Sequence, residues 1–251
     1  MTMGRPSPAE QRARQLFMIA TIARLLDGAG HVAVGSTSPV PASGALLARR
    51  RNPGMRVSIL GSERHNAFTD GNRELFDCAA QGRIDAFFLS GGQIDGMGRI
   101  NLVGLGPYPE TSLRFPGSFG SAFLYPLVPR VILFREVHSP RTLVERVDFV
   151  SAAPGRADRG DRNAGPVALV TGLAHFSFDR EAGRFALAAT APGVSPAEIR
   201  DTTGFGYDAG RAFPFSLDPD LAQEVDAIVR AELADDYPAF ARRWTGEAAA
   251  T

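Results

Sequence analysis

Short runs rich in apolar residues alternate with amphipathic segments over the first half of the chain. The apolar runs lie at residues 31–35, 56–60, 86–89 and 131–134. Residues 86–89 and 131–134 are apolar without interruption, as is typical of strands covered on both faces. Residues 42–51 and 72–81 lie between the runs and have helical character. Strands and helices in this alternation predict βαβ units and a parallel sheet.

Two capping boxes mark the starts of further helices. Ser7–Glu10 and Ser195–Glu198 each combine an N-cap serine, a proline at the first helical position and a glutamate three residues after the cap. The first helix is expected to end at Asp27, before two glycines, and the second to last about two turns. Asp218-Pro219 predicts the start of another helix, over 220–233.

The sequence pattern of the C-terminal half predicts strands joined by a turn, without a helix between them. Residues 166–171 form an apolar strand, and 176–178 and 185–187 flank a polar turn, which is typical of a β-hairpin. Residues 141–146 predict a short helix and 147–150 a strand. Residues 153–165 are rich in Gly, Arg, Asp and Ala, which indicates a mobile loop or a boundary. We therefore expect one α/β domain over 1–251: an open, mostly parallel sheet with helices on both faces and a C-terminal hairpin portion.

Charge and composition exclude some function classes. The formal net charge is zero, and a nucleic-acid-binding surface usually shows as an excess of basic residues, so no nucleic-acid partner is expected. All 27 Lys and Arg residues are arginine. Because arginine cannot act as an amine nucleophile, Schiff-base chemistry is excluded for this chain acting alone.

Cysteine and histidine usage argues against a metal site. Cys78 is the single cysteine and lies in a helical pattern, so we expect it to be a buried apolar residue. The four histidines are far apart and none has metal-ligand spacing. We expect no metal and a structural or solvated role for each histidine.

No apolar run reaches the ~20 residues that span a bilayer. The longest early run, 16–23, lies between two arginines and lacks a cleavage site for a signal peptide. We therefore expect no membrane association and a cytoplasmic protein.

A glycine-rich segment, Gly91–Asn101, follows the apolar run at 86–89. Four glycines in eight positions allow close approach of the backbone to a neighbour or ligand, and Asp95 and Asn101 can hold such a loop by hydrogen bonds to its backbone. Ligands of open α/β sheets bind beyond the carboxyl ends of strands. The segment is thus either a binding loop or a tight packing turn, and the residues alone leave both open.

Two more loops carry candidate chemistry. Glu63, in the polar segment 61–66, is either a carboxylate nucleophile or base, or a surface acid paired with an arginine. The small residues of 114–122 either direct backbone N–H groups toward an oxyanion or form a plain turn. Gly-x-Ser-x-Gly and phosphate-binding loop motifs are absent, which disfavours serine hydrolases and nucleotide triphosphatases.

Taken in order, these segments resemble the β subunit of class I CoA-transferases, of the glutaconate CoA-transferase type. Gly91–Asn101 is similar to the family pattern Gly-Gly-Ala-Gln-Ile-Asp-x-x-Gly-Asn-x-Asn, and Arg114–Gly120 to Arg-Phe-x-Gly-Ser-Gly-Gly. Residues 32–39, 147–151 and 193–205 match further landmarks, so the resemblance covers nearly the whole chain and implies a CoA-transferase fold, also called NagB-like.

The resemblance implies an α subunit as partner, in a heterodimer or an α2β2 tetramer, and an acyl-CoA thioester as substrate. In the family a β-subunit glutamate attacks the thioester, forming an enzyme-bound anhydride and then a glutamyl-CoA thioester, and CoA passes to a second carboxylic acid. Coenzyme A, as the substrate thioester, is the implied cofactor. The candidate CoA-binding residues are Gly91, Gly92, Gln93, Asp95, Asn101, Gly117, Ser118, Phe119 and Gly120.

The chain departs from the family pattern at the glutamate. An ungapped alignment through Asn52-Pro53-Gly54 places Leu60 there, and leucine cannot attack a thioester. Glu63, three residues later, is the candidate catalytic carboxylate, although three extended residues span up to ~10 Å. Phe119 replaces a family glycine and adds bulk at the loop implied to meet the ligand.

Three functions therefore stay open. The first is CoA transfer with Glu63 as nucleophile. The second is ring-opening hydrolysis of a cyclic acyl-CoA with an α-subunit carboxylate, as the resemblance to relatives without the glutamate implies. The third is a non-catalytic subunit that binds CoA or only scaffolds its partner.

Overall fold

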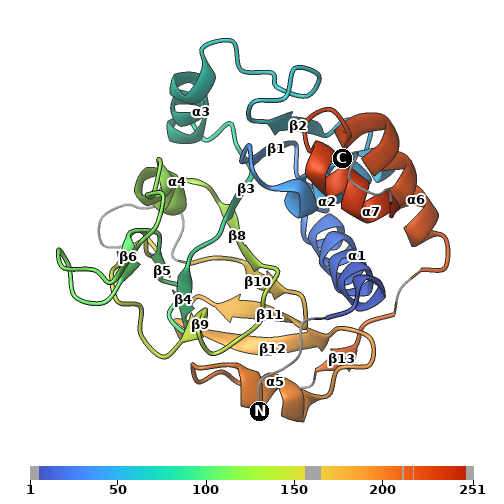
Figure 1. The fold of residues 1–251 in the computed structure, drawn as a ribbon. Helices are drawn as coiled ribbons and strands as arrows, with labels where there is room; N and C mark the ends of the chain where they lie inside the picture. The colour runs from blue at the N-terminus through green and yellow to red at the C-terminus, as the bar shows by residue number, and fades with distance from the viewer. Residues whose placement is uncertain (1–5, 156–164, 211, 217, 247–251) are drawn as a thin grey trace.

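The computed structural model describes residues 6–155, 165–210, 212–216 and 218–246, and it contains the expected open α/β sheet with helices on both faces (Figure 1). The strand order in the main sheet is β13-β12-β11-β10-β8-β3-β1-β2. Its parallel part is formed by β2 (Arg56–Ile59), β1 (His31–Val34), β3 (Ala86–Leu89), β8 (Arg130–Arg135) and β10 (Ala168–Thr171). The antiparallel hairpin is β11 (Ala174–Asp179) and β12 (Arg184–Thr190), and β13 (Phe213–Pro214) pairs with β12 in parallel.

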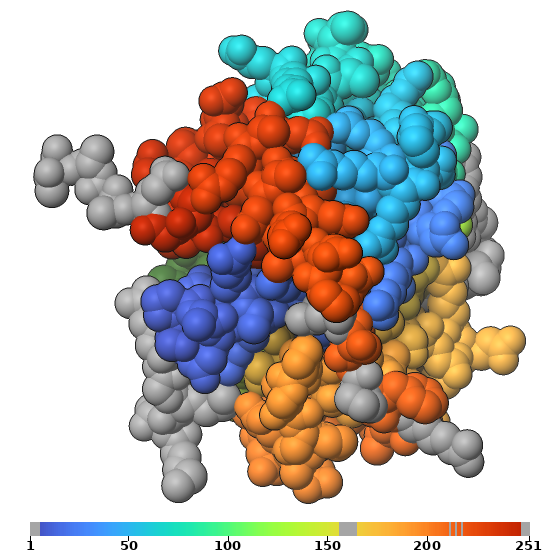
Figure 2. Space-filling view, turned by 90° about the vertical axis from the view of Figure 1, so that its right-hand side faces the viewer, coloured from blue at the N-terminus to red at the C-terminus, as the bar shows by residue number. Residues whose placement is uncertain are grey.

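Both faces of the parallel strands are buried, as the uninterrupted apolar runs predict. On β3, Phe88 packs into one hydrophobic cluster, and Phe87 and Leu89 pack into the other on the opposite face. The first cluster contains side chains of α1 (Pro8–Leu25), α2 (Pro39–Arg51), α6 (Leu221–Ile228) and α7 (Pro238–Thr245). The second contains side chains of α3 (Gly71–Ala80), α4 (Ser121–Leu127) and α5 (Pro196–Thr202). Figure 2 shows the red C-terminal helices packed beside the blue N-terminal helix, so the ends of the chain close one face together.

The two predicted capping motifs each begin a helix, although the reciprocal bond from the glutamate is recorded only at Ser7. The Ser7 side chain accepts from the Glu10 backbone N–H while the Glu10 side chain accepts from the Ser7 backbone, and the Ser195 side chain caps α5. α2 begins at Pro39, three residues earlier than expected, because proline at the first helical position extends the helix toward the strand. Cys78 is buried, as expected.

The region after β8 differs from the prediction. Instead of a helix over 141–146, Leu143–Val144 forms β9, which pairs with β4 (Gln93–Asp95). Residues 147–150 form no strand. The local pattern was misleading here because a pairing distant in sequence fixes the backbone. The predicted helix over 220–233 is present as α6 followed by a π-helical turn, Val229–Leu233. The sequence analysis missed α4, α7 and the short strands β5 (Ile100–Asn101), β6 (Gly104–Leu105) and β7 (Leu113–Arg114).

Most of the predicted mobile loop lies outside the described residues, which include only 153–155 and 165 of it. Within the described ranges, no helix combines the length and apolar character needed to cross a membrane.

Candidate active site

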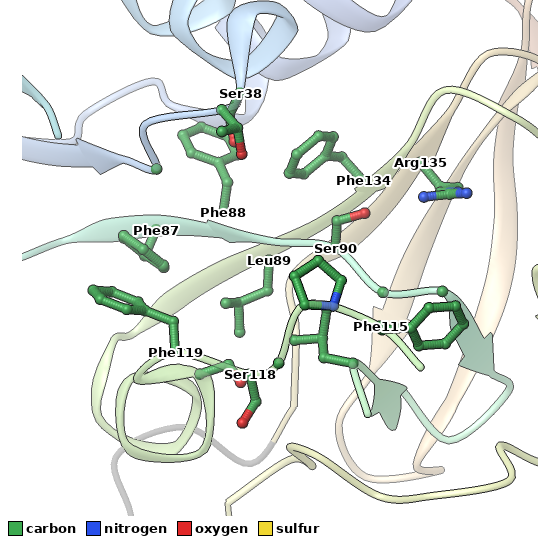
Figure 3. A pocket seen from close by; sticks show the side chains of 18 of the residues that line it. Ser38, Phe87, Phe88, Leu89, Ser90, Phe115, Ser118, Phe119, Phe134 and Arg135 are labelled. Atoms are coloured by element: carbon green, nitrogen blue, oxygen red, sulfur yellow. The ribbon is translucent and has the colours of Figure 1, made fainter. Parts of the chain in front are cut away.

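A cavity of about 730 Å³ opens at the carboxyl ends of β1, β3 and β8 (Figure 3). This is the edge where ligands bind in open α/β sheets. The cavity is lined by Gly35, Thr37, Ser38, Phe87–Gly92, Leu102, Phe115–Phe119, Ser121, Leu124 and Phe134–Val137. The two loops singled out from the sequence, 91–101 and 114–122, therefore meet at one cavity.

The Gly91–Asn101 segment folds into the β4–β5 hairpin, and buried polar side chains fix its ends. The Asn101 amide donates to Gln93 Oε1 (2.8 Å) and to the Gly104 carbonyl (2.7 Å). Gln93 Oε1 also accepts from the Asp148 backbone N–H (2.9 Å). The hairpin is thereby joined to the segment after β9.

Asp95 closes the turn of the hairpin and is fully buried. Its Oδ2 accepts from Arg99 Nε (2.7 Å), and its Oδ1 accepts from the backbone N–H groups of Met97 (3.1 Å) and Arg99 (3.2 Å). Gln93, Asp95 and Asn101 thus shape the loop from inside, and none of them lines the cavity. Direct contact of these three with CoA stays a prediction.

Gly91 and Gly92 line the cavity and are also tightly packed. A Cβ atom at Gly92 would lie 2.3 Å from the Phe115 ring, and one at Gly91 would lie 2.7 Å from the Gln93 carbonyl oxygen. The segment is therefore a packing turn whose outer surface faces the cavity. Its role as a binding loop stays a prediction.

We expect Gly92→Ala to displace Phe115 and to lower the free energy of unfolding by about 1–3 kcal/mol, the usual cost of overpacking. Urea denaturation measures this loss. Gly206→Ala is the matched control, because nothing lies within 4 Å of the added methyl group. Equal stability of the two variants would contradict the proposed packing constraint.

The loop 114–122 has positive φ angles, which favour glycine, at Gly117 and also at Phe119. Gly117 has φ +110° and Phe119 has φ +44°. The Phe119 ring packs against Phe76 with a 5.6 Å centroid separation, so the added bulk has a partner outside the loop. The backbone N–H groups of Ser118, Phe119 and Gly120 donate no hydrogen bond to any residue that the structure describes. Of the four residues predicted here, Gly117, Ser118 and Phe119 line the cavity and Gly120 does not.

Glu63 lies apart from this cavity. Its side chain is exposed on a turn after β2, and Glu63 is not among the lining residues. The turn is held closed because Ser62 Oγ accepts from the His65 N–H (2.9 Å) and the His65 carbonyl accepts from the Ile59 N–H (3.0 Å). Leu60 is buried in the apolar cluster beneath α3. The structure therefore does not bring Glu63 together with the 117–120 loop.

The titratable side chains that do line the cavity, Arg135 and Glu136, were missed by the sequence analysis. They directly follow the apolar run 131–134, and that position at the carboxyl end of a strand was the available signal. Two buried polar atoms of the lining, Arg135 Nε and Ser121 Oγ, have no hydrogen-bond partner among the described residues. Because buried polar atoms are normally paired, these two are free to bind an ordered water or a polar group of a ligand.

Comparison with known proteins fits this geometry. Residues 17–202 match the family model described as Coenzyme A transferase. The chain belongs to the coenzyme A transferase family. The resemblance inferred from the sequence motifs is thereby confirmed.

Two curated relatives are the B subunits of CoA-transferases. The B subunit of glutaconate CoA-transferase from Acidaminococcus fermentans is 31% identical over 155 residues, which are 58% of this chain and 56% of that protein. The B subunit of 3-oxoadipate CoA-transferase from Pseudomonas knackmussii is 29% identical over 131 residues, 49% of this chain and 50% of that protein. The chain thus matches about half the length of these relatives.

Solved structures of the family match more completely. The decarboxylase AibA/AibB is 26% identical with a TM-score of 0.72, over 88% of this chain and 94% of that chain. Glutaconate CoA-transferase of A. fermentans has a TM-score of 0.75 at 23% identity, over 87% and 94% of the two chains, which shows the shared fold. The family fold therefore carries both a transferase and a decarboxylase among these relatives.

Proposed function

We propose that this chain is the β subunit of a heteromeric enzyme that acts on acyl-CoA thioesters and transfers CoA to a carboxylic acid. The observation that carries the proposal is the meeting of loops 91–101 and 114–122 at one cavity in a chain of this family. We propose that an α subunit completes the site. Both curated relatives are named as B subunits, which supports such a partner.

The chemistry of the cavity suits a thioester carbonyl. The unused N–H groups of Ser118, Phe119 and Gly120 can donate to the oxyanion that forms when the carbonyl carbon is attacked. Apolar side chains such as Phe87, Leu89 and Phe134 line the same cavity and would contact the acyl chain. We propose that Gly91 and Gly92 admit CoA beside them because neither has a side chain.

A second candidate function is hydrolysis of an acyl-CoA with the catalytic carboxylate on the α subunit. It is favoured because this chain brings no carboxylate from the family glutamate position to the cavity. Leu60, which the ungapped alignment assigns to the glutamate position, is buried, and Glu63 lies outside the cavity. Transfer and hydrolysis differ in one requirement, because transfer needs an acceptor acid and hydrolysis needs only water. A structural relative is named as a decarboxylase, so the fold alone does not decide between transfer and hydrolysis.

The test is to co-purify the chain with its α subunit and to follow acyl-CoA consumption with and without acceptor acids. Formation of a new acyl-CoA that depends strictly on the acceptor supports transfer. CoA release with incorporation of labelled oxygen from water, in the absence of any acceptor, supports hydrolysis. An α subunit that is fully active alone would show that this chain is a scaffold.

Glu63→Gln is expected to leave turnover of the complex within about twofold, because the side chain is exposed and outside the cavity. The matched variant is Glu136→Gln, which removes the carboxylate that lines the cavity in the described chain. Measurement of kcat for both variants decides the source of the nucleophile. A large loss with Glu63→Gln alone would restore Glu63 as nucleophile, and full activity of both variants would place the carboxylate on the α subunit.

A further inference from the structure

Arg135 is a half-buried cation without a counterion. It is the last residue of β8, and its side chain lines the cavity. Its side chain makes no hydrogen bond or ion pair with any residue that the structure describes, and its Nε is shielded from solvent. By contrast, Arg49 is paired with Glu232 (2.7 Å) and Arg99 with Asp95 (2.7 Å). Because Nε is shielded from solvent and lacks an acceptor, the guanidinium is partly desolvated without compensation. An anion that enters the cavity would offset that cost.

The neighbouring carboxylate does not serve as the partner of Arg135. Glu136 Oε2 accepts from Gln15 Nε2 of α1 (2.9 Å), and this bond holds the carboxylate toward the helix. Burial lowers the pKa of Arg135, and the charge of Glu136 only partly offsets this effect. The guanidinium nevertheless stays charged at neutral pH.

The surroundings of Arg135 suit one anionic group on an otherwise apolar ligand. Phe115 and Phe134 line the same cavity, and the hydroxyl of Ser90 is drawn pointing to the side on which Arg135 lies (Figure 3). The Ser90 hydroxyl makes no hydrogen bond with a described residue, so it is available as a second donor. Arginine presents a planar fork that matches carboxylate and phosphate oxygens.

We propose that Arg135, with the Ser90 hydroxyl, binds an oxyanion of the acyl-CoA substrate. This oxyanion is either a second carboxylate on the acyl group or a phosphate of CoA. The proposal rests on the proposed function and deepens it, because it identifies the residue that selects substrates by charge. Arg135 is then a specificity-determining residue and takes no part in bond breaking.

Titration calorimetry of the complex with its α subunit tests the proposal with three probes: glutaryl-CoA, butyryl-CoA and butyryl-pantetheine. Arg135→Met is expected to weaken glutaryl-CoA binding by about 10- to 100-fold, the usual effect of losing a charge-assisted hydrogen bond. Arg184→Met is the control, because it removes an exposed arginine outside the cavity. Arg135→Lys keeps the charge without the fork, so its affinity should lie between wild type and Arg135→Met; it also provides the test if Arg135→Met does not assemble.

The three probes separate the two sources of the anion. A loss confined to glutaryl-CoA identifies the acyl carboxylate, and an equal loss for both CoA thioesters but not for butyryl-pantetheine identifies a phosphate. The proposal is overturned if Arg135→Met binds all three probes with wild-type affinity, or if the substitution lowers the affinity for all three equally. It is also overturned if the wild-type complex binds none of them. Turnover is measured separately, so a complex that binds but does not react refutes only the proposed function.

Discussion

Acidification from pH 7 to pH 4 is expected to remove several kcal/mol from the free energy of unfolding, because the buried His138 and the half-buried His175 must take up protons. Burial lowers the pKa of His138 and of His175 to about 4. An unfolded histidine titrates near 6.5. Each residue therefore contributes stability that is fully present above pH 6.5 and is lost as the pH falls through about 4. Linkage gives about 3 kcal/mol for each histidine.

The surroundings of the two rings explain why the neutral form is preferred. His138 lies between the Thr171 and Thr203 hydroxyls, at 2.8 and 2.9 Å from its ring nitrogens, and the charge of Arg14 lowers its pKa further. Nε2 of His175 is shielded and has no hydrogen-bond partner among the described residues. Burial is the main reason that the pKa of each ring is lowered, and no nearby carboxylate offsets it in the described part of the chain.

Urea denaturation at pH 7, 5.5 and 4 measures the effect. His138→Gln should be less stable than wild type at pH 7 but should lose about 3 kcal/mol less on acidification. Parallel pH profiles of the two proteins would contradict the assignment to His138. Acid loss in this range that persists in a variant with both histidines replaced would point to the carboxylates instead.

Asp95→Ala is expected to destabilise the protein by about 3–5 kcal/mol, the cost of breaking a buried ion pair by removing one partner. The carboxylate accepts from the Arg99 side chain, from two turn N–H groups and from the Val147 N–H (3.4 Å), and all four donors would lose it. Because the hairpin carries one wall of the cavity, activity should fall although Asp95 does not line it.

Thermal and urea unfolding measure the effect of Asp95→Ala. Asp235→Ala removes an exposed carboxylate elsewhere and should change the free energy of unfolding by no more than ~0.5 kcal/mol. Asp95→Asn keeps the shape and one acceptor oxygen, so its loss should be smaller than that of alanine. Wild-type stability of Asp95→Ala would show that the hairpin is held by other contacts.

The sequence predicted elements where local pattern and final contacts agree. The apolar run 86–89 became β3 because both of its faces are covered, and Ser7 and Ser195 began helices because a cap acts within one turn. The predicted helix at 141–146 failed because Leu143–Val144 pairs with residues about fifty positions earlier. Helix α4 was missed because its first two residues were included in the loop 114–122 and residues 123–127 were assigned to no element.

The sequence predicted which loops form the candidate site, but it identified only some of the residues that line it. The glycine-rich motifs indicated both loops, yet the roles of Gln93 and Asn101 depend on contacts that no spacing reveals. Arg135 was overlooked because a single arginine in a sequence gives no sign that it will lack a counterion. The position of Glu63 relative to the cavity depends on a turn whose course only the fold determines.

Both edge strands of the main sheet, β2 and β13, are poorly suited to pairing with a further strand. Its outer strands are short, with four residues in β2 and two in β13, and Pro214 offers no N–H for pairing. At β2 the Ile59 N–H is already occupied by the chain's own His65 carbonyl. Short or blocked edges discourage addition of a foreign strand. A second polypeptide is therefore expected to dock through side chains and loops, without extending the sheet across the boundary.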